Sequence, residues 1–179
     1  MRFQKTALEG AWVIEPDPLT DERGFFARTF CVRAFGEKGL EPIFVQHSIS
    51  YSRQAGTLRG MHYQGEPYAE VKLVSCMRGA ICDVIVDLRQ YSRTFRKWAS
   101  FELSAENRQL LYVPKGFAHG FLTLSDEVTV SYLISEFHTP SAARGLRYDD
   151  PAIGIEWPSP PSIVSEKDLS WPYLSAQAV

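Results

Sequence analysis

The chain has 179 residues, 45% hydrophobic and 22% charged, which is the balance of one soluble globular domain with a sizeable core. Its net charge of −2 and pI of about 6.1 give no electrostatic argument for nucleic acid or an anionic membrane as a partner. No apolar run approaches the roughly 20 residues of a membrane span, and the N-terminus lacks the apolar centre of a signal peptide.

Three cysteines, Cys31, Cys76 and Cys82, are too few and too scattered for a disulfide framework or a zinc site. Cys76 and Cys82 lie in apolar segments, and we expect both to be buried thiols. These features predict a single cytoplasmic domain over residues 1–179.

The first 52 residues alternate between short strands and turns. We expect a strand at 11–15, a polar loop, a strand at 26–30 and a short helix at 31–38. A further strand at 44–52 has a face of small polar residues, which either lines a ligand cavity or faces solvent: Gln46, Ser48, Ser50 and Ser52.

Residues 56–64, Gly-Thr-Leu-Arg-Gly-Met-His-Tyr-Gln, form the central predicted strand. On a straight strand Arg59 and His62 point to opposite faces. Gly60 lies between them, and a glycine inside a strand often marks a bulge or a close backbone approach. If both side chains serve one site, the strand must slip by one residue at Gly60.

Two apolar runs follow at 71–77 and 80–88, joined by Arg78 and Gly79. This pattern predicts a hairpin with a tight turn. Lys72 shares a face with apolar residues, and lysines are rarely buried unless paired. It is therefore either an edge residue or a working one.

The second half continues with strands predicted at 98–103, 110–113 and 128–137. A Pro/Gly turn at 114–120 delivers His119 to the start of another strand. Tyr132 lies on an apolar face, where it is either a core tyrosine with a hydrogen-bond partner or a functional one. The tail from residue 139 is rich in proline and charge.

Many short strands with little helix indicate an all-β fold: an antiparallel sandwich or barrel of the jelly-roll, cupin-like type with a few short helices. Such barrels often place a site at the barrel mouth. The polar residues available for an interior site are His62, Lys72, His119 and Tyr132, together with several arginines.

A metal site is the first interpretation to weigh, because the Pro-x-Gly-x-x-His segment resembles the second metal motif of cupins. The first motif would require His-x-His, but Gln64 stands two residues after His62. Zinc and iron need three or four ligands, so we expect no metal. Histidine, tyrosine and lysine instead suit proton transfer beside a carbonyl, which inverts a carbon without a cofactor.

Several segments together resemble the dTDP-4-dehydrorhamnose 3,5-epimerases over residues 8–172. They are GTLRGMHYQ, KLV, RGAICDVIVDLR, VPKGFAHGF, the strand of Tyr132, DDP, IEWP and SEKD. The resemblance implies a jelly roll, a homodimer that exchanges N-terminal strands, no metal or cofactor, and a nucleotide-linked 4-keto-6-deoxyhexose as substrate.

The resemblance also implies catalytic roles for four residues. His62 looks like the base, and Asp168 like the carboxylate that orients it. Lys72 looks like the group that stabilises the enolate, and Tyr132 like the acid on the opposite face.

Substrate-binding positions matched to the family are Arg23, Gln46, Arg59, His119 and Lys167. Three positions depart from the family's pattern: Arg28 and Ala143 stand where glutamate is usual, and Ser48 stands where asparagine is usual. Arg28 and Ser48 are also assigned to substrate binding. The departures predict unchanged proton chemistry with an altered nucleotide or sugar preference.

Three alternatives remain open from the sequence. The first is an epimerase that acts only at C3 or only at C5 of a different nucleotide-linked ketosugar. The second is a non-catalytic cupin that binds a sugar nucleotide, and the third is a metal-dependent cupin enzyme.

Overall fold

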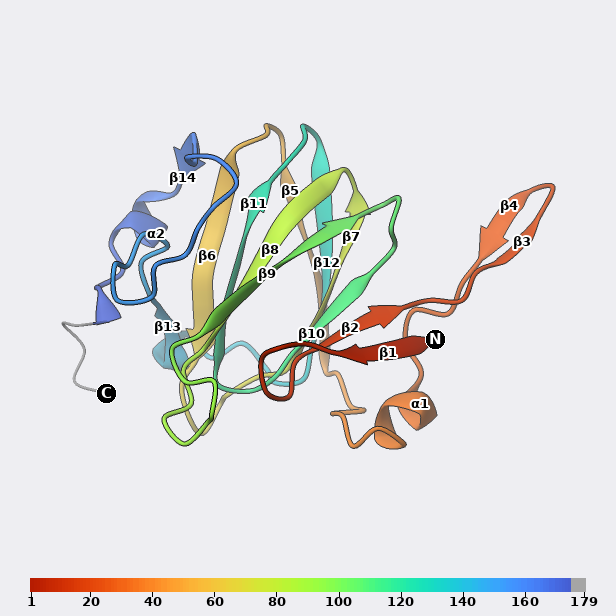
Figure 1. Ribbon diagram of the computed structural model, residues 1–179, viewed down its shortest axis with the longest axis horizontal. Helices are drawn as coiled ribbons and strands as arrows, with labels where there is room; N and C mark the ends of the chain where they lie inside the picture. The colour runs from red at the N-terminus through yellow and green to blue at the C-terminus, as the bar shows by residue number, and fades with distance from the viewer. Residues whose placement is uncertain (175–179) are drawn as a thin grey trace.

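The computed structural model describes residues 1–174 and consists mainly of two facing β-sheets that close into a barrel (Figure 1). The first sheet has the order β1 (Arg2–Lys5), β2 (Trp12–Glu15), β10 (Leu110–Val113), β7 (Lys72–Arg78), β12 (Val128–Ile134) and β5 (Gln46–Ser52). The second has the order β13 (Ala143–Gly145), β6 (Thr57–Gln64), β11 (Phe117–Thr123), β8 (Ala80–Asp87) and β9 (Trp98–Ser104). The predicted all-β, cupin-like fold is confirmed.

All pairings within these sheets are antiparallel except one: β14 (Ile163–Val164) pairs in parallel with Thr57 and Leu58 at the start of β6. The helices are short: α1 (Val32–Gly36), the 3₁₀ turn η1 (Pro140–Ala142) and α2 (Glu166–Leu169). The structure shortens the predicted helix at 31–38 and ends the strand predicted at 128–137 at Ile134.

The core lies between the two sheets because strand alternation turns every second apolar side chain inward. Val74, Ile81, Ile85 and Phe121 are among its fully enclosed members. A second cluster centred on Phe35 covers the outer face of the first sheet, and the C-terminal segment covers the second sheet. Cys76 is buried as predicted, whereas Cys82 is only half-buried.

The predicted hairpin at Arg78 and Gly79 is wrong. β7 pairs with β10 and β12, whereas β8 pairs with β9 and β11, so the turn is a corner between the two sheets. Gly79 has φ of +76°, and a Cβ there would lie 2.8 Å from a Val128 methyl group. The local turn signal was correct, but it does not distinguish a hairpin from a corner.

The predicted slip in β6 is present. His62 pairs with His119 and Arg59 with Phe121, so three residue steps on β6 match two on β11. At Gly60 the backbones nearly touch, because a Cβ would lie 2.6 Å from the Gly120 Cα. This bulge turns Arg59 and His62 toward the same cavity.

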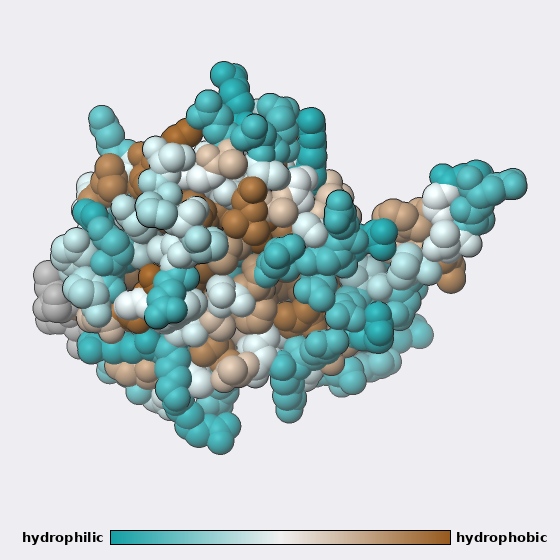
Figure 2. All heavy atoms as spheres, turned by 45° about the horizontal axis from the view of Figure 1, so that its top comes forward, coloured by the Kyte–Doolittle hydropathy of each residue, from teal (hydrophilic) through white to brown (hydrophobic). Residues whose placement is uncertain are grey.

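A two-stranded arm, β3 (Leu19–Asp21) and β4 (Gly24–Phe26), projects from the barrel (Figure 1). Leu19 is 73% exposed and Phe26 67%; Figure 2 shows apolar surface along the arm behind a hydrophilic tip. The strand predicted at 26–30 is wrong. Phe30 turns away from the arm and packs edge-on against Phe35 and Phe44.

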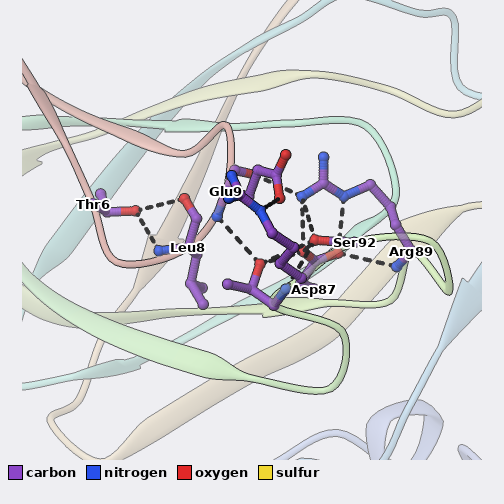
Figure 3. Close-up of polar contacts among 8 residues, drawn as sticks. Thr6, Leu8, Glu9, Asp87, Arg89 and Ser92 are labelled. Carbon is purple, nitrogen blue, oxygen red and sulfur yellow. Dashed lines mark hydrogen bonds and ion pairs between the residues drawn. The ribbon is translucent and has the colours of Figure 1, made fainter.

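The turn between β1 and β2 is clasped to the loop after β8 by a buried carboxylate (Figure 3). Asp87 accepts hydrogen bonds from Arg89, Ser92 and Thr94, and the Arg89 guanidinium also donates to the Glu9 carbonyl at 2.6 Å. Burial acts to raise the pKa of Asp87, but these donors outweigh it and lower the pKa.

Membrane-spanning helices are absent from residues 1–174, since none of the three short helices there combines enough length with enough apolar character.

Candidate active site

A cavity of about 590 Å³ opens between the two sheets at the end where β6 meets the C-terminal segment. Its lining brings together residues far apart in the sequence. The polar and charged ones are Gln46, Ser48, Ser50, Thr57, Arg59, His62, Tyr63, Gln64, Glu70, Lys72, His119, Tyr132, His138, Arg144, Ser165, Lys167 and Asp168.

His62 on β6 is paired with Asp168 on α2, Nε2 to Oδ1 at 2.6 Å. The Gly60 N–H also donates to this carboxylate at 3.3 Å. Burial acts to raise the pKa of Asp168, but the hydrogen bonds outweigh it and the pKa is lowered. Asp168 is therefore an anion in direct hydrogen-bond contact with the histidine ring.

Asp168 reaches this place because the C-terminal segment is fastened to β6. β14 pairs with the start of β6, the Ser165 hydroxyl accepts a hydrogen bond from the Asp168 N–H, and Arg147 donates to the Leu169 carbonyl at 2.7 Å. Trp171 packs over Gly145, where any Cβ would lie 2.4 Å from the indole.

A second histidine–carboxylate pair lies beside the first. His119 on β11, opposite His62, contacts both carboxylate oxygens of the fully buried Asp83 on β8 at 2.9 and 3.0 Å. Burial raises the pKa of Asp83, and the contact with His119 opposes that rise.

Tyr132 on β12 faces these pairs from the other sheet, with its ring 6.2 Å from that of His119. Its hydroxyl is 2.9 Å from the Ser50 hydroxyl on β5. Burial raises the pKa of the phenol, which the Ser50 contact opposes only in part. Tyr132 therefore keeps its proton across the neutral range.

Lys72 projects into the cavity from β7, on the same sheet as Tyr132. Its ammonium lies 3.0 Å from a Glu70 carboxylate oxygen and 3.4 Å from the His62 carbonyl. Of the two readings left open by the sequence, an edge residue is excluded, because Lys72 lies on a strand paired on both sides.

The cavity mouth carries further positive charge. Arg59 is tied to β5 through the Ser52 hydroxyl at 3.0 Å and the Tyr51 carbonyl at 2.8 Å. Lys167 lies over the Trp171 ring at 5.7 Å. The polar face of β5 lines this cavity, while the opposite face is exposed, with Ile49 at 70%.

The structure brings every sequence-assigned residue to this cavity except Arg23 and Arg28. Arg23 lies at the tip of the arm and pairs with Asp21, and Arg28 lies near the base of the arm. Ala143, the third departure, lines the cavity.

Sequence reasoning missed Ser50, Glu70 and Asp83 as partners of the assigned residues. Ser50 lies on the predicted strand face that carries Gln46 and Ser48, and Asp83 is a charged residue on an otherwise apolar strand face; these were the available signals. Their partners stand on other strands, so only the sheet order and register identify the pairs.

Across the cavity, then, a histidine backed by a carboxylate faces a protonated phenol, and a lysine on the same sheet as the phenol extends its ammonium into the cavity. Such a set can remove a proton from one face of a substrate, stabilise negative charge on oxygen, and return a proton to the other face. Within residues 1–174 no group of three or more His, Cys, Asp or Glu side chains is placed to hold a metal ion.

Known proteins resemble this chain over its whole length. The sequence model of the family described as dTDP-4-dehydrorhamnose 3,5-epimerase matches residues 5–176. The enzyme of that name from Methanothermobacter thermautotrophicus is 49% identical, with 99% of this chain and 97% of the relative covered.

Two solved structures share the fold closely. The dTDP-4-dehydrorhamnose 3,5-epimerase of Elizabethkingia anophelis superposes with a TM-score of 0.95 at 41% identity, covering 100% of this chain and 99% of its own. The 3,5-epimerase of Legionella pneumophila, solved in complex with dTDP-4-keto-L-rhamnose, gives 0.92 at 37% identity, covering 98% and 93%.

Fold, cavity and relatives together define a cupin-like isomerase of the sugar-epimerase class. The chain belongs to the dTDP-4-dehydrorhamnose 3,5-epimerase family.

Proposed function

We propose that this enzyme inverts C3 and C5 of a nucleotide-linked 4-keto-6-deoxyhexose, converting dTDP-4-dehydro-6-deoxyglucose to dTDP-4-dehydrorhamnose. The observation that carries the proposal is the placement of the His62–Asp168 pair and Tyr132 on opposite walls of one cavity. The ligand in the Legionella relative, dTDP-4-keto-L-rhamnose, supports the substrate class.

The C4 carbonyl makes the hydrogens on C3 and C5 acidic. His62 takes one of these protons, and the electron pair moves onto the C4 oxygen as an enolate. Lys72 stabilises that charge by donating a hydrogen bond. Tyr132 then protonates the carbon from the opposite face, and the carbonyl reforms with inverted configuration.

The substrate is neither oxidised nor reduced in these reaction steps, so we propose no cofactor and no metal. Asp168 is anionic and in direct contact with His62, so its negative charge offsets the positive charge that the ring gains when it takes a proton. Before the second carbon reacts, His62 must release the proton it has taken and Tyr132 must regain one, both by exchange with water.

For binding, we propose that Arg59 and Lys167 meet the anionic nucleotide part at the mouth, while Gln46, Ser48 and His119 contact the rest of the substrate. Arginine and lysine are the side chains that best match phosphate oxygens.

We also propose a homodimer in which the arm of one copy reaches the other copy's cavity with Arg23 and Arg28. The exposed apolar side chains of the arm support this, as does β5, the last strand of its sheet, whose outer edge is unpaired within residues 1–174.

Phe26→Ser should shift the mass in solution from twice 20.3 kDa toward the monomer. Tyr91→Ser, a matched change of an exposed aromatic far from the arm, should not. A monomeric wild type would contradict the arrangement.

Arg28, Ser48 and Ala143 depart from the family's pattern, and we infer that they alter nucleotide or sugar preference without touching proton transfer. Calorimetric titration with dTDP, CDP, UDP and GDP measures this. A strong preference for dTDP would contradict an altered base preference.

We place the enzyme in the cytoplasm, supported by its three free thiols.

The experiment for the proposed reaction is NMR of dTDP-4-keto-6-deoxyglucose in deuterated water. We expect deuterium at C3 and at C5 with the wild type, and none with His62→Ala. His47→Ala, a matched change on the exposed face of β5, should behave as the wild type. Deuterium at a single carbon would reduce the assignment to a one-site epimerase. No exchange in the wild type would contradict the reaction on the dTDP-linked sugar, and the same experiment with the CDP-linked ketosugar would separate a different nucleotide preference from a non-catalytic binder.

A further inference from the structure

Glu70 is a cavity-lining carboxylate to which sequence analysis assigned no role. Its side chain is 11% exposed and that of Lys72 is 12%, and the two charged groups lie 3.0 Å apart. Both residues line the cavity that holds the His62–Asp168 pair. The pair is therefore largely shielded from water, where ion pairs are stronger and broken pairs cost more than at the surface.

The backbone between these residues is pinned. The Val71 N–H donates to the Ser135 hydroxyl at 2.8 Å, and the Ser135 N–H donates to the Val71 carbonyl at 3.0 Å. Val71 itself is buried in the cluster around Phe35. Because extended backbone alternates its side chains, Glu70 and Lys72 then point together into the cavity.

Among the three carboxylates Glu70, Asp83 and Asp168, only Glu70 pairs with Lys72, because the other two are hydrogen-bonded to other groups. Asp83 is engaged through both oxygens by His119, and Asp168 by His62 and the Gly60 N–H. A lysine is a flexible stem carrying a compact charge. Without Glu70, its ammonium would no longer be held by a carboxylate.

The donors of Lys72 can be counted. An ammonium group has three N–H bonds. One meets Glu70 at 3.0 Å and one meets the His62 carbonyl at 3.4 Å. With these two directions fixed, the third N–H has a fixed direction as well.

We infer that Glu70 is a positioning residue, which holds the Lys72 ammonium so that its remaining N–H meets the substrate's carbonyl oxygen. The inference rests on the proposed epimerisation. Glu70 acts through Lys72 and does not touch the substrate. Its loss should therefore slow the chemical step, in which charge develops on that oxygen, and leave substrate binding nearly unchanged.

The test compares Glu70→Ala and Glu70→Gln in steady-state kinetics. We expect kcat to fall at least about tenfold for alanine, the scale of losing a hydrogen bond to a charged group, with KM changed less than about threefold. Glutamine keeps an acceptor and should restore part of kcat. Glu102→Gln, an exposed glutamate on β9, is the matched control and should be neutral.

A double-mutant cycle isolates the route of the effect. In the background of Lys72→Ala, removing Glu70 should cause no further loss. An equal loss in both backgrounds, a rise in KM alone, or unchanged kcat in Glu70→Ala would overturn the inference.

A second readout needs no turnover. Limited acetylation by acetic anhydride, followed by mass spectrometry, compares the reaction rate of Lys72 with that of Lys97. Glu70→Ala should raise that ratio several-fold, and an unchanged ratio would overturn the inference. A wild type without epimerase activity would count against the proposed function alone, because the acetylation ratio still decides whether Glu70 holds the lysine.

Discussion

Asp168 and Tyr132 are held in opposite protonation states by their surroundings. Burial acts to raise the pKa of Asp168, but its hydrogen bonds overcome burial and lower it. Burial raises the pKa of Tyr132, and the opposing effects of the Ser50 hydrogen bond and the Arg59 charge are smaller. A carboxylate behind His62 and a protonated phenol across the cavity therefore coexist at neutral pH, as a base and an acid require.

Ser50 fixes the direction of the Tyr132 hydroxyl through their contact at 2.9 Å. Ser50→Ala should lower kcat by roughly fivefold, the worth of about 1 kcal/mol for one neutral hydrogen bond, with KM nearly unchanged. Ser131→Ala, the same change on the other face of the sheet, is the control for steady-state kinetics. An equal effect of the two variants would show that the loss comes from general destabilisation of the sheet.

At the scale of the strand, the bulge in β6 decides whether the cavity forms. Gly60 has φ of +140°, and a Cβ would lie 2.6 Å from the Gly120 Cα. Gly60→Ala should destabilise the fold by about 1–3 kcal/mol and lower activity beyond the loss of folded protein, because Arg59 and His62 flank the bulge. Thermal unfolding and specific activity measure the two effects.

Gly36→Ala is the matched control for that change. Gly36 ends α1, its φ is not in the left-handed region, and nothing lies within 4 Å of its Cβ position. Alanine there should be neutral or slightly stabilising. If Gly60→Ala were equally harmless, the close approach of β6 and β11 would not be essential for the site.

The same strand shows what sequence reasoning could reach. The parity of Arg59 and His62, with a glycine between them, predicted the bulge on the condition that both side chains serve one site, and that argument needs only neighbours along the chain. The turn at Gly79 was equally visible in the sequence, but whether β8 pairs with β7 depends on sheet order.

The pairs Asp83–His119 and Glu70–Lys72 were missed. The first spans two strands, and the second depends on the inward direction of a short segment that precedes β7.

At the scale of the whole molecule, the hydrogen bonds of Asp87 make the free energy of unfolding depend on pH. The pKa of Asp87 is lowered in the folded state, so its contribution is present above the ordinary carboxyl pKa and is lost as pH falls through the folded value. Asp87→Asn should lower the free energy of unfolding at pH 7 by about 3 kcal/mol, the cost of breaking a buried ion pair. The variant should also lose less stability than the wild type between about pH 5 and pH 2.

Urea unfolding at fixed protein concentration measures this prediction, since an oligomer's stability varies with concentration. Asp21→Asn serves as the control, because Asp21 forms its ion pair with Arg23 on the exposed arm. It should change stability little at either pH. Parallel pH profiles for the wild type and Asp87→Asn would contradict the role of the Asp87 hydrogen bonds.

The central claim is that base and acid act from opposite walls of one cavity, and Tyr132→Phe tests it most directly. In deuterated water, with dTDP-4-keto-6-deoxyglucose, NMR follows deuterium uptake and inversion separately. With the acid removed, His62 should still exchange substrate hydrogen on its own face, while inversion slows by at least about a hundredfold. If uptake and inversion fell together to the same extent, or neither fell, the two-wall account would be contradicted.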